Sequence, residues 1–103
     1  MEYEINMKIV LASRPDGYPK EHNFEVIESQ IPIVREGELL LKILWLSLDP
    51  YMRARMNDIR SYAPSVGLGE TMVGGAIGRV IESRSPMFNV DDIVEGNLGW
   101  QSY

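Results

Sequence analysis

The segment Asp49-Pro50-Tyr51 carries the residue types in this chain that are best placed to do chemistry. An almost wholly apolar run over Leu39–Leu48 ends there, and a short basic segment rich in methionine follows. Asp is a favoured N-cap residue, and Pro is favoured at the first helical position, where no backbone donor is needed. We therefore predict a short helix whose first side chains lie just beyond a strand, held by the scaffold but open to solvent.

The residue types in this predicted helix leave more than one role open. The Tyr51 phenol can donate a hydrogen bond to a substrate oxygen, or it can be a half-buried aromatic group whose hydroxyl meets a backbone partner. Arg53 and Arg55 can complement the C-terminal end of the helix, form a solvated face, or contact a phosphate group of a cofactor. Met52 and Met56 lie four residues apart, so we expect both on the helix face that packs in the core.

Metal catalysis is disfavoured by the composition. The chain has no cysteine, which excludes disulfides, thiolate catalysis and cysteine-ligated zinc. His22 is the only histidine and lies in the polar segment 20–23, where we expect a surface residue rather than a catalytic base. A transition-metal site would need carboxylates almost alone, and none are suitably clustered, so we predict no metal site.

The glycine cluster over 74–78 is a candidate phosphate-binding loop, but its context argues against that role. A dinucleotide fingerprint follows a strand and opens a helix. In this chain the first glycine of the fingerprint is absent, and the cluster runs into the strand-like residues Arg79-Val80-Ile81-Glu82. A bulge or a close backbone approach within a strand is the better interpretation.

The supporting elements are predicted to be mainly β. Strands are expected over residues 7–12, 24–31, 39–48, 72–83, 93–95 and 98–103, with turn chemistry at Arg14–Gly17 and a loop over 57–70. The run at 39–48 is apolar enough to predict a strand covered on both faces. Short strands at near-regular spacing indicate one domain with an antiparallel sheet folded into a barrel or sandwich.

Charge and hydropathy limit the kinds of partner that this chain can bind. The net charge of −5 disfavours nucleic-acid binding, and Arg53, Arg55 and Arg60 make too small a basic cluster for it. The acidic N-terminus is not a secretory signal, and the longest apolar run is far short of the roughly 20 residues of a membrane helix. We expect no membrane association and a cytoplasmic location. Because the last residues stop in mid-pattern, with Trp100 and Tyr103 expected at an exposed sheet edge, we also expect part of a longer protein.

Several segments together resemble one branch of the medium-chain dehydrogenase/reductase superfamily. They are Leu48–Met56 (LDPYMRARM), Ser61–Pro64 (SYAP), Val73–Gly75 through Arg79–Ser83, Gly99–Gln101, and the opening Val10–Pro15. The branch is that of the zinc-independent, NADP-dependent alkenal double-bond reductases, which includes leukotriene dehydrogenase/prostaglandin reductase and the curcumin-reductase-like enzymes. The resemblance covers essentially the whole chain, and the D-P-Y-M-R segment followed by G-G-x-x-G-x-V is specific as a pair.

The resemblance implies a GroES-like, partly open β-barrel with one short helix. Residues 1–103 would be the N-terminal part of the catalytic domain, and the Rossmann cofactor domain would be absent from this chain. The full-length protein would be a homodimer that uses NADPH, without a metal, to reduce the C=C bond of a small α,β-unsaturated aldehyde or ketone. The segment alone would be inactive. The alternative is a stand-alone, non-catalytic GroES-like module for binding or assembly.

The resemblance also implies roles for Tyr51 and the glycine pair. Tyr51 matches the tyrosine that faces the substrate beside the nicotinamide, where it would orient the substrate rather than act as the essential acid. Zinc-dependent relatives carry a His-Glu pair where this chain has Gly74 and Gly75. Many family members have a larger residue at the position of Gly75, a tyrosine in plant members, so we expect a roomier substrate pocket here. The resemblance leaves unknown which residues of this segment contact the cofactor, which would be bound mainly by the absent domain.

Overall fold

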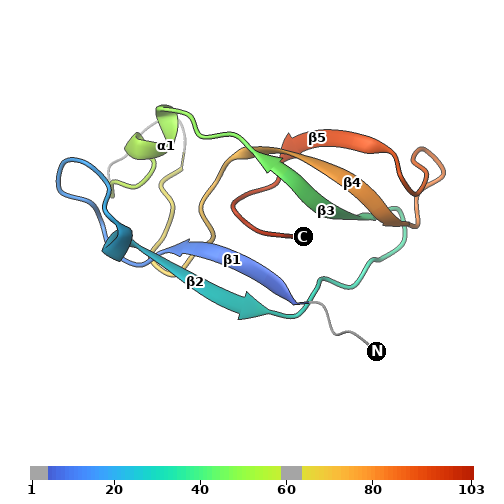
Figure 1. Cartoon of the computed structure of the whole chain (residues 1–103), viewed down its shortest axis with the longest axis horizontal. Helices are drawn as coiled ribbons and strands as arrows, with labels where there is room; N and C mark the ends of the chain where they lie inside the picture. The colour runs from blue at the N-terminus through green and yellow to red at the C-terminus, as the bar shows by residue number, and fades with distance from the viewer. Residues whose placement is uncertain (1–4, 59–63) are drawn as a thin grey trace.

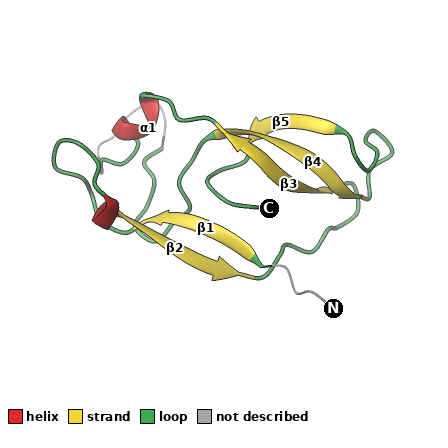
Figure 2. Cartoon of the chain, viewed as in Figure 1, coloured by secondary structure: helices red, strands yellow, loops and turns green. Residues whose placement is uncertain are grey.

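A computed structural model describes residues 5–58 and 64–103 as two antiparallel sheets and one short helix (Figures 1 and 2). The elements in chain order are β1 (Asn6–Leu11), the 3-10 turn η1 (Glu21–Asn23), β2 (Phe24–Ser29), β3 (Leu39–Leu46), α1 (Tyr51–Ala54), β4 (Gly75–Ser83) and β5 (Ile93–Asn97). The prediction of a mainly β chain with one short helix is confirmed. Arg60 and the segment 61–63 of the resemblance lie outside the described residues.

The first sheet is the hairpin-like pair β1–β2. It is antiparallel, with Asn6 opposite Ser29 and Leu11 opposite Phe24. The predicted turn between these strands is present, and Gly17 has a φ of +81°, a left-handed conformation that favours glycine. The predicted strand at 24–31 is present but ends at Ser29, and its burial does not alternate strictly, because Val26 is exposed together with Glu25.

The second sheet has the order β3–β4–β5, with both pairs antiparallel. A Cβ on Gly78 would lie 3.1 Å from the Leu41 Cβ and 3.2 Å from the Lys42 carbonyl oxygen. This tight fit accompanies register shifts in β3, so the predicted close backbone approach is confirmed at Gly78. The predicted strand at 72–83 begins only at Gly75, because residues 72–74 turn away to contact β1 and Trp100 instead.

The expectation that β3 is covered on both faces is wrong for this chain. Trp45 is 73% exposed and Leu44 is 43% exposed. β3 pairs with β4 alone and is therefore an edge strand, and the described residues supply no further layer over these two side chains. The apolar sequence of β3 predicted burial, but the described residues do not bury Leu44 and Trp45.

The core lies where α1 meets the first sheet and the segment before β4. Its buried residues are Leu11, Met52, Met56, Val66 and Met72, with Phe24, Val73 and Trp100 packed against them. Met52 and Met56 share this core as predicted. A single helical turn is not stable by itself, so these tertiary contacts determine where α1 lies.

The C-terminal residues differ from the prediction of a further strand over 98–103. Gly99, at a φ of +81°, turns the chain back inward, and Trp100 stacks on Phe24 with ring centroids 5.6 Å apart. Trp100 is therefore packed against the core and is not an aromatic residue at an exposed edge. The segment then crosses between the sheets: the Ser102 amide donates to the Met7 carbonyl at 3.0 Å, and the Ile43 amide donates to the Ser102 carbonyl at 2.9 Å (Figure 1).

Candidate functional site

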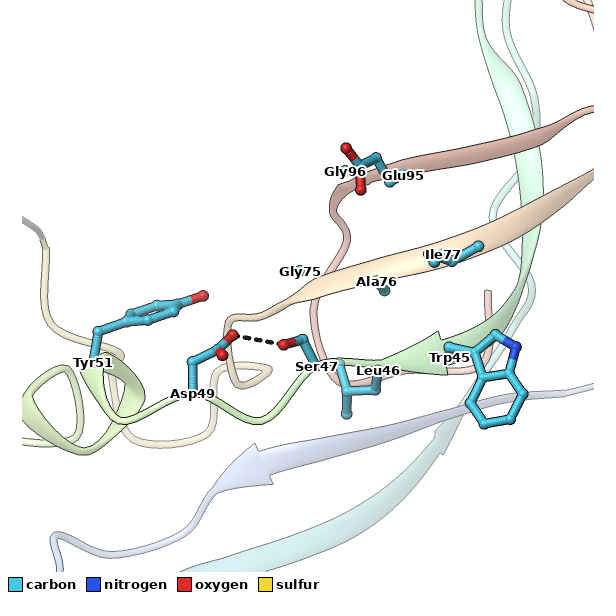
Figure 3. A pocket seen from close by; sticks show the side chains of 10 residues that line it. All are labelled: Trp45, Leu46, Ser47, Asp49, Tyr51, Gly75, Ala76, Ile77, Glu95 and Gly96. Carbon is cyan, nitrogen blue, oxygen red and sulfur yellow. Dashed lines mark hydrogen bonds between the residues drawn. The ribbon is translucent and has the colours of Figure 1, made fainter.

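A pocket of about 600 Å³ opens where β3 ends, α1 begins and β4 starts (Figure 3). Its lining residues are Trp45, Leu46, Ser47, Asp49, Tyr51, Gly75, Ala76, Ile77, Glu95 and Gly96. This volume lies within the range of small-molecule and cofactor sites. The two site residues predicted from the sequence, Tyr51 and Gly75, are thus brought together in one wall.

Tyr51 is the first residue of α1, and its ring extends across the opening toward the start of β4 (Figure 3). The residue is 45% exposed. No hydrogen bond to a described residue occupies its hydroxyl, so the alternative of a phenol tied to a backbone partner does not describe this tyrosine. The hydroxyl is left available to a molecule in the pocket.

Gly75 and its neighbour Gly74 face different surroundings. A Cβ on Gly75 would meet nothing within 4 Å, so the missing side chain leaves open pocket space. A Cβ on Gly74 would lie 2.9 Å from the Met52 Cε and 3.0 Å from the Trp100 Nε1. Gly75 therefore enlarges the pocket, whereas Gly74 lets the backbone approach the core.

The joint between β3 and α1 is stabilised differently from the prediction. The expected N-cap, Asp49, makes no capping hydrogen bond, and Pro50 occupies the cap position. Instead the Ser47 hydroxyl donates to the Asp49 Oδ2 at 2.7 Å, a local side-chain bond that competes with capping. The Ser47 amide also donates to the Gly75 carbonyl at 2.9 Å, which joins the end of β3 to the start of β4 beside the pocket.

The structure places Arg53 and Arg55 in hydrogen bonds to backbone carbonyls of neighbouring loops, a role that the sequence did not predict. Arg53 donates from Nε to the Gly17 carbonyl at 2.9 Å and from Nη2 to the Pro15 carbonyl at 3.0 Å. Arg55 donates from Nε to the Pro64 carbonyl at 2.9 Å. Both guanidinium groups connect α1 to neighbouring loops. Their neutral carbonyl partners could not be inferred from the spacing of charges along the chain.

Charged groups in the pocket wall are acidic. Asp49 and Glu95 line it, and no lysine or arginine does so among the described residues. Glu95 reaches the wall because β5 pairs with β4, where Glu95 lies opposite Ile77. Glu95 and Ser47 could not be predicted as wall residues, since strand register places them there and no local motif marks either one.

His22 lies on the exposed surface in η1, as expected for a residue of a polar loop. Across residues 5–58 and 64–103, no three His, Asp or Glu side chains are grouped in a way that could hold a metal ion. Within the same residues, no helix is long and apolar enough to cross a membrane.

The fold and this pocket define a β-rich domain of the medium-chain oxidoreductase type, and the comparison with known families agrees. The chain belongs to the family described as the N-terminal domain of oxidoreductase, whose model matches residues 7–103. Among curated relatives, the chain is 49% identical over 98 residues to an NADPH-dependent curcumin reductase from Escherichia coli (strain K12), covering 95% of the chain and 28% of the relative. It is 39% identical over 102 residues to a 2-alkenal reductase (NADP(+)-dependent) from Nicotiana tabacum, covering 95% of the chain and 30% of the relative.

The same branch supplies a close structural match. The crystal structure of CurA from Vibrio vulnificus superposes with a TM-score of 0.92 at 49% identity, covering 94% of the chain and 29% of CurA. The structure of CurA in complex with NADPH superposes with a TM-score of 0.89. The GroES-like fold and the resemblance to the NADP-dependent branch are thereby confirmed. The chain spans less than a third of the length of these relatives.

Proposed function

We propose that this chain is the N-terminal, GroES-like part of the catalytic domain of an NADPH-dependent reductase that saturates the C=C bond of α,β-unsaturated aldehydes and ketones. The carrying observation is the free Tyr51 hydroxyl, which projects into a pocket of about 600 Å³ beside the open position of Gly75. The named activities of the curcumin and alkenal reductases among its relatives support this reaction class.

The pocket residues suit two flat, uncharged groups, the enone and the dihydronicotinamide ring of NADPH. Leu46, Ala76 and Ile77 supply apolar wall, and Gly75 leaves backbone bare where a ring can approach. NADPH would supply a hydride for the substrate β-carbon, and a Rossmann domain outside this chain would bind most of the cofactor. The structure of the CurA relative with NADPH supports the choice of this cofactor.

Tyr51 would orient the substrate and stabilise charge. As hydride reaches the β-carbon, negative charge develops on the carbonyl oxygen, and a donor aimed at that oxygen lowers the barrier. The phenol O–H of Tyr51 is such a donor at the pocket wall. We assign it an orienting role rather than that of the essential acid, because solvent or a cofactor ribose hydroxyl can also stabilise the enolate.

The acidic wall favours uncharged substrates. Asp49 and Glu95 would repel a carboxylate group on a substrate, and no cation of the described wall offsets them. The residue types of this chain also suit metal-free chemistry. According to the resemblance, zinc-dependent relatives carry a His-Glu pair at the positions of Gly74 and Gly75, and this chain has no cysteine.

The full-length protein that carries this chain tests the proposal. It should oxidise NADPH in the presence of a simple alkenal, with no loss of activity after chelation and dialysis, and residues 1–103 alone should show no turnover. Activity that a chelator abolishes, or no activity on any enone, would contradict the proposal. Sedimentation of the same protein would show whether it is the expected homodimer.

One observation favours a second candidate, a non-catalytic module for binding or assembly. Trp45 and Leu44 are exposed apolar side chains on an edge strand, which is typical of a surface that meets another protein element. A native reading frame that ends at Tyr103, a discrete oligomer in solution and no affinity for nicotinamide nucleotides would together favour this candidate over the reductase.

A further inference from the structure

Two arginines connect α1 to the turn that follows β1, and they do so in opposite directions. Arg53 reaches from α1 to the Gly17 and Pro15 carbonyls of the turn, at 2.9 and 3.0 Å. Arg14 reaches from the turn to the Met56 and Val66 carbonyls beyond α1, at 3.0 and 2.7 Å from its Nη1. All four acceptors are neutral backbone carbonyls. These hydrogen bonds therefore fix the position of α1 against the turn and do not neutralise the charge of either arginine.

The Arg53 guanidinium is held by partners within the chain. Its third nitrogen, Nη1, donates to the Asn57 Oδ1 at 2.7 Å, so all three nitrogens of the fork already have an acceptor. A planar fork fixes direction as well as distance, which an ammonium group does not. These bonds suit Arg53 to fix the rotation of α1.

Tyr51 depends on such support. It opens a helix of only four residues, and no bond to a described residue holds its own hydroxyl. The core contacts of Met52 and Met56 hold one face of that turn. We propose that Arg53, together with Arg14, is a positioning residue that aims the Tyr51 phenol into the pocket. This inference rests on the proposed function of Tyr51.

A double-mutant cycle in the full-length protein separates positioning from mere stabilisation. The variants are Arg53→Met, Tyr51→Phe and their combination, each assayed for NADPH oxidation with a small alkenal. Arg53→Met should lower kcat by about 10-fold or more, since small displacements of a catalytic group are costly. KM should change much less, and the loss should not exceed that of Tyr51→Phe.

In the Tyr51→Phe background, Arg53→Met should lower kcat by no more than about 2-fold, because the hydroxyl that it aims is gone. Arg53→Lys keeps the charge but loses the fork, and it should restore part of kcat. Arg84→Met is the matched control: Arg84 donates to the Val34 carbonyl at 3.3 Å, away from the pocket, and its loss should leave kcat unchanged.

Three outcomes would overturn the inference. Equal losses from Arg53→Met with and without the Tyr51 hydroxyl would show that Arg53 acts elsewhere. A lower melting temperature with unchanged kcat would show a purely structural contact. If Arg53→Met does not fold, Arg53→Lys is measured with and without Tyr51→Phe. An equal loss of kcat in the two cases would count against the positioning role of Arg53. By contrast, a Tyr51→Phe variant with unchanged kcat would contradict the proposed role of Tyr51 itself, so the two failures are distinguishable.

Discussion

Gly74 lies so close to Trp100 that a Cβ at this position would be 3.0 Å from the indole nitrogen. The next residue, Gly75, faces open pocket space, with nothing within 4 Å of the same added atom. The lack of a side chain thus has a different consequence at each of these adjacent glycines. The first permits close packing against the core, and the second leaves the pocket wall bare.

Gly74→Ala should destabilise the protein by about 1–3 kcal/mol, since an added methyl group overpacks a site bounded by an indole ring. Gly75→Ala is the matched control, and it should leave the free energy of unfolding unchanged or raise it by up to about 1 kcal/mol. Urea unfolding of both variants measures the difference. Equal destabilisation of the two would contradict the distinction between these glycines.

Gly75→Tyr should make the enzyme discriminate by substrate size. The phenol ring would fill space that is now open, so kcat/KM for a bulky aromatic enone should fall by about 10-fold or more relative to a small alkenal. The ratio of the two specificity constants is the measurement, with Gly75→Ala as the size control. An equal loss for both substrates would place Gly75 outside the substrate pocket.

Asn6 should be among the most sensitive polar positions outside the pocket. Its side chain is fully buried, and its Oδ1 accepts from the Ser102 and Tyr103 amides at 3.2 and 3.0 Å. Asn6→Leu removes this acceptor and should cost about 1–3 kcal/mol in unfolding free energy. Asn97→Ala, at an exposed strand end, should stay within about 0.5 kcal/mol. Equal effects of the two would show that the Asn6 network does not hold the C-terminal segment.

Local patterns in the sequence predicted the local structure well. Turn chemistry identified the bend at Gly17, and the four-residue spacing placed Met52 and Met56 in the core. These features depend on neighbours in the chain, so a short window of sequence is enough to recognise them.

Features that depend on distant partners were missed. Asn6 is buried because residues 101–103 return to β1, and Arg14 is bound because α1 lies beside the turn. Trp100 was expected at an exposed edge because the inward turn at Gly99 cannot be read from hydropathy. Glu95 entered the pocket wall only through the β4–β5 register. The resemblance brought out Tyr51 and Gly75, but the strand pairing supplied the rest of the wall.

Tyr51→Phe should slow turnover without weakening cofactor binding. Loss of one hydrogen bond to a developing oxyanion lowers kcat by about 100- to 1000-fold, and an orienting role predicts the lower end of that range. NADPH affinity, measured by fluorescence titration, should be unchanged. A variant with unaltered kcat would return Tyr51 to a structural role.

The most direct test follows the transferred hydrogen in the full-length protein. With NADPH deuterated at the transferred position and an α,β-unsaturated ketone as substrate, mass spectrometry and NMR of the product locate the deuterium. We predict one deuterium on the former β-carbon, a saturated C–C bond and an intact carbonyl group. Deuterium on the carbonyl carbon of an allylic alcohol, or no transfer to any enone, would contradict the assignment of this chain to a double-bond reductase.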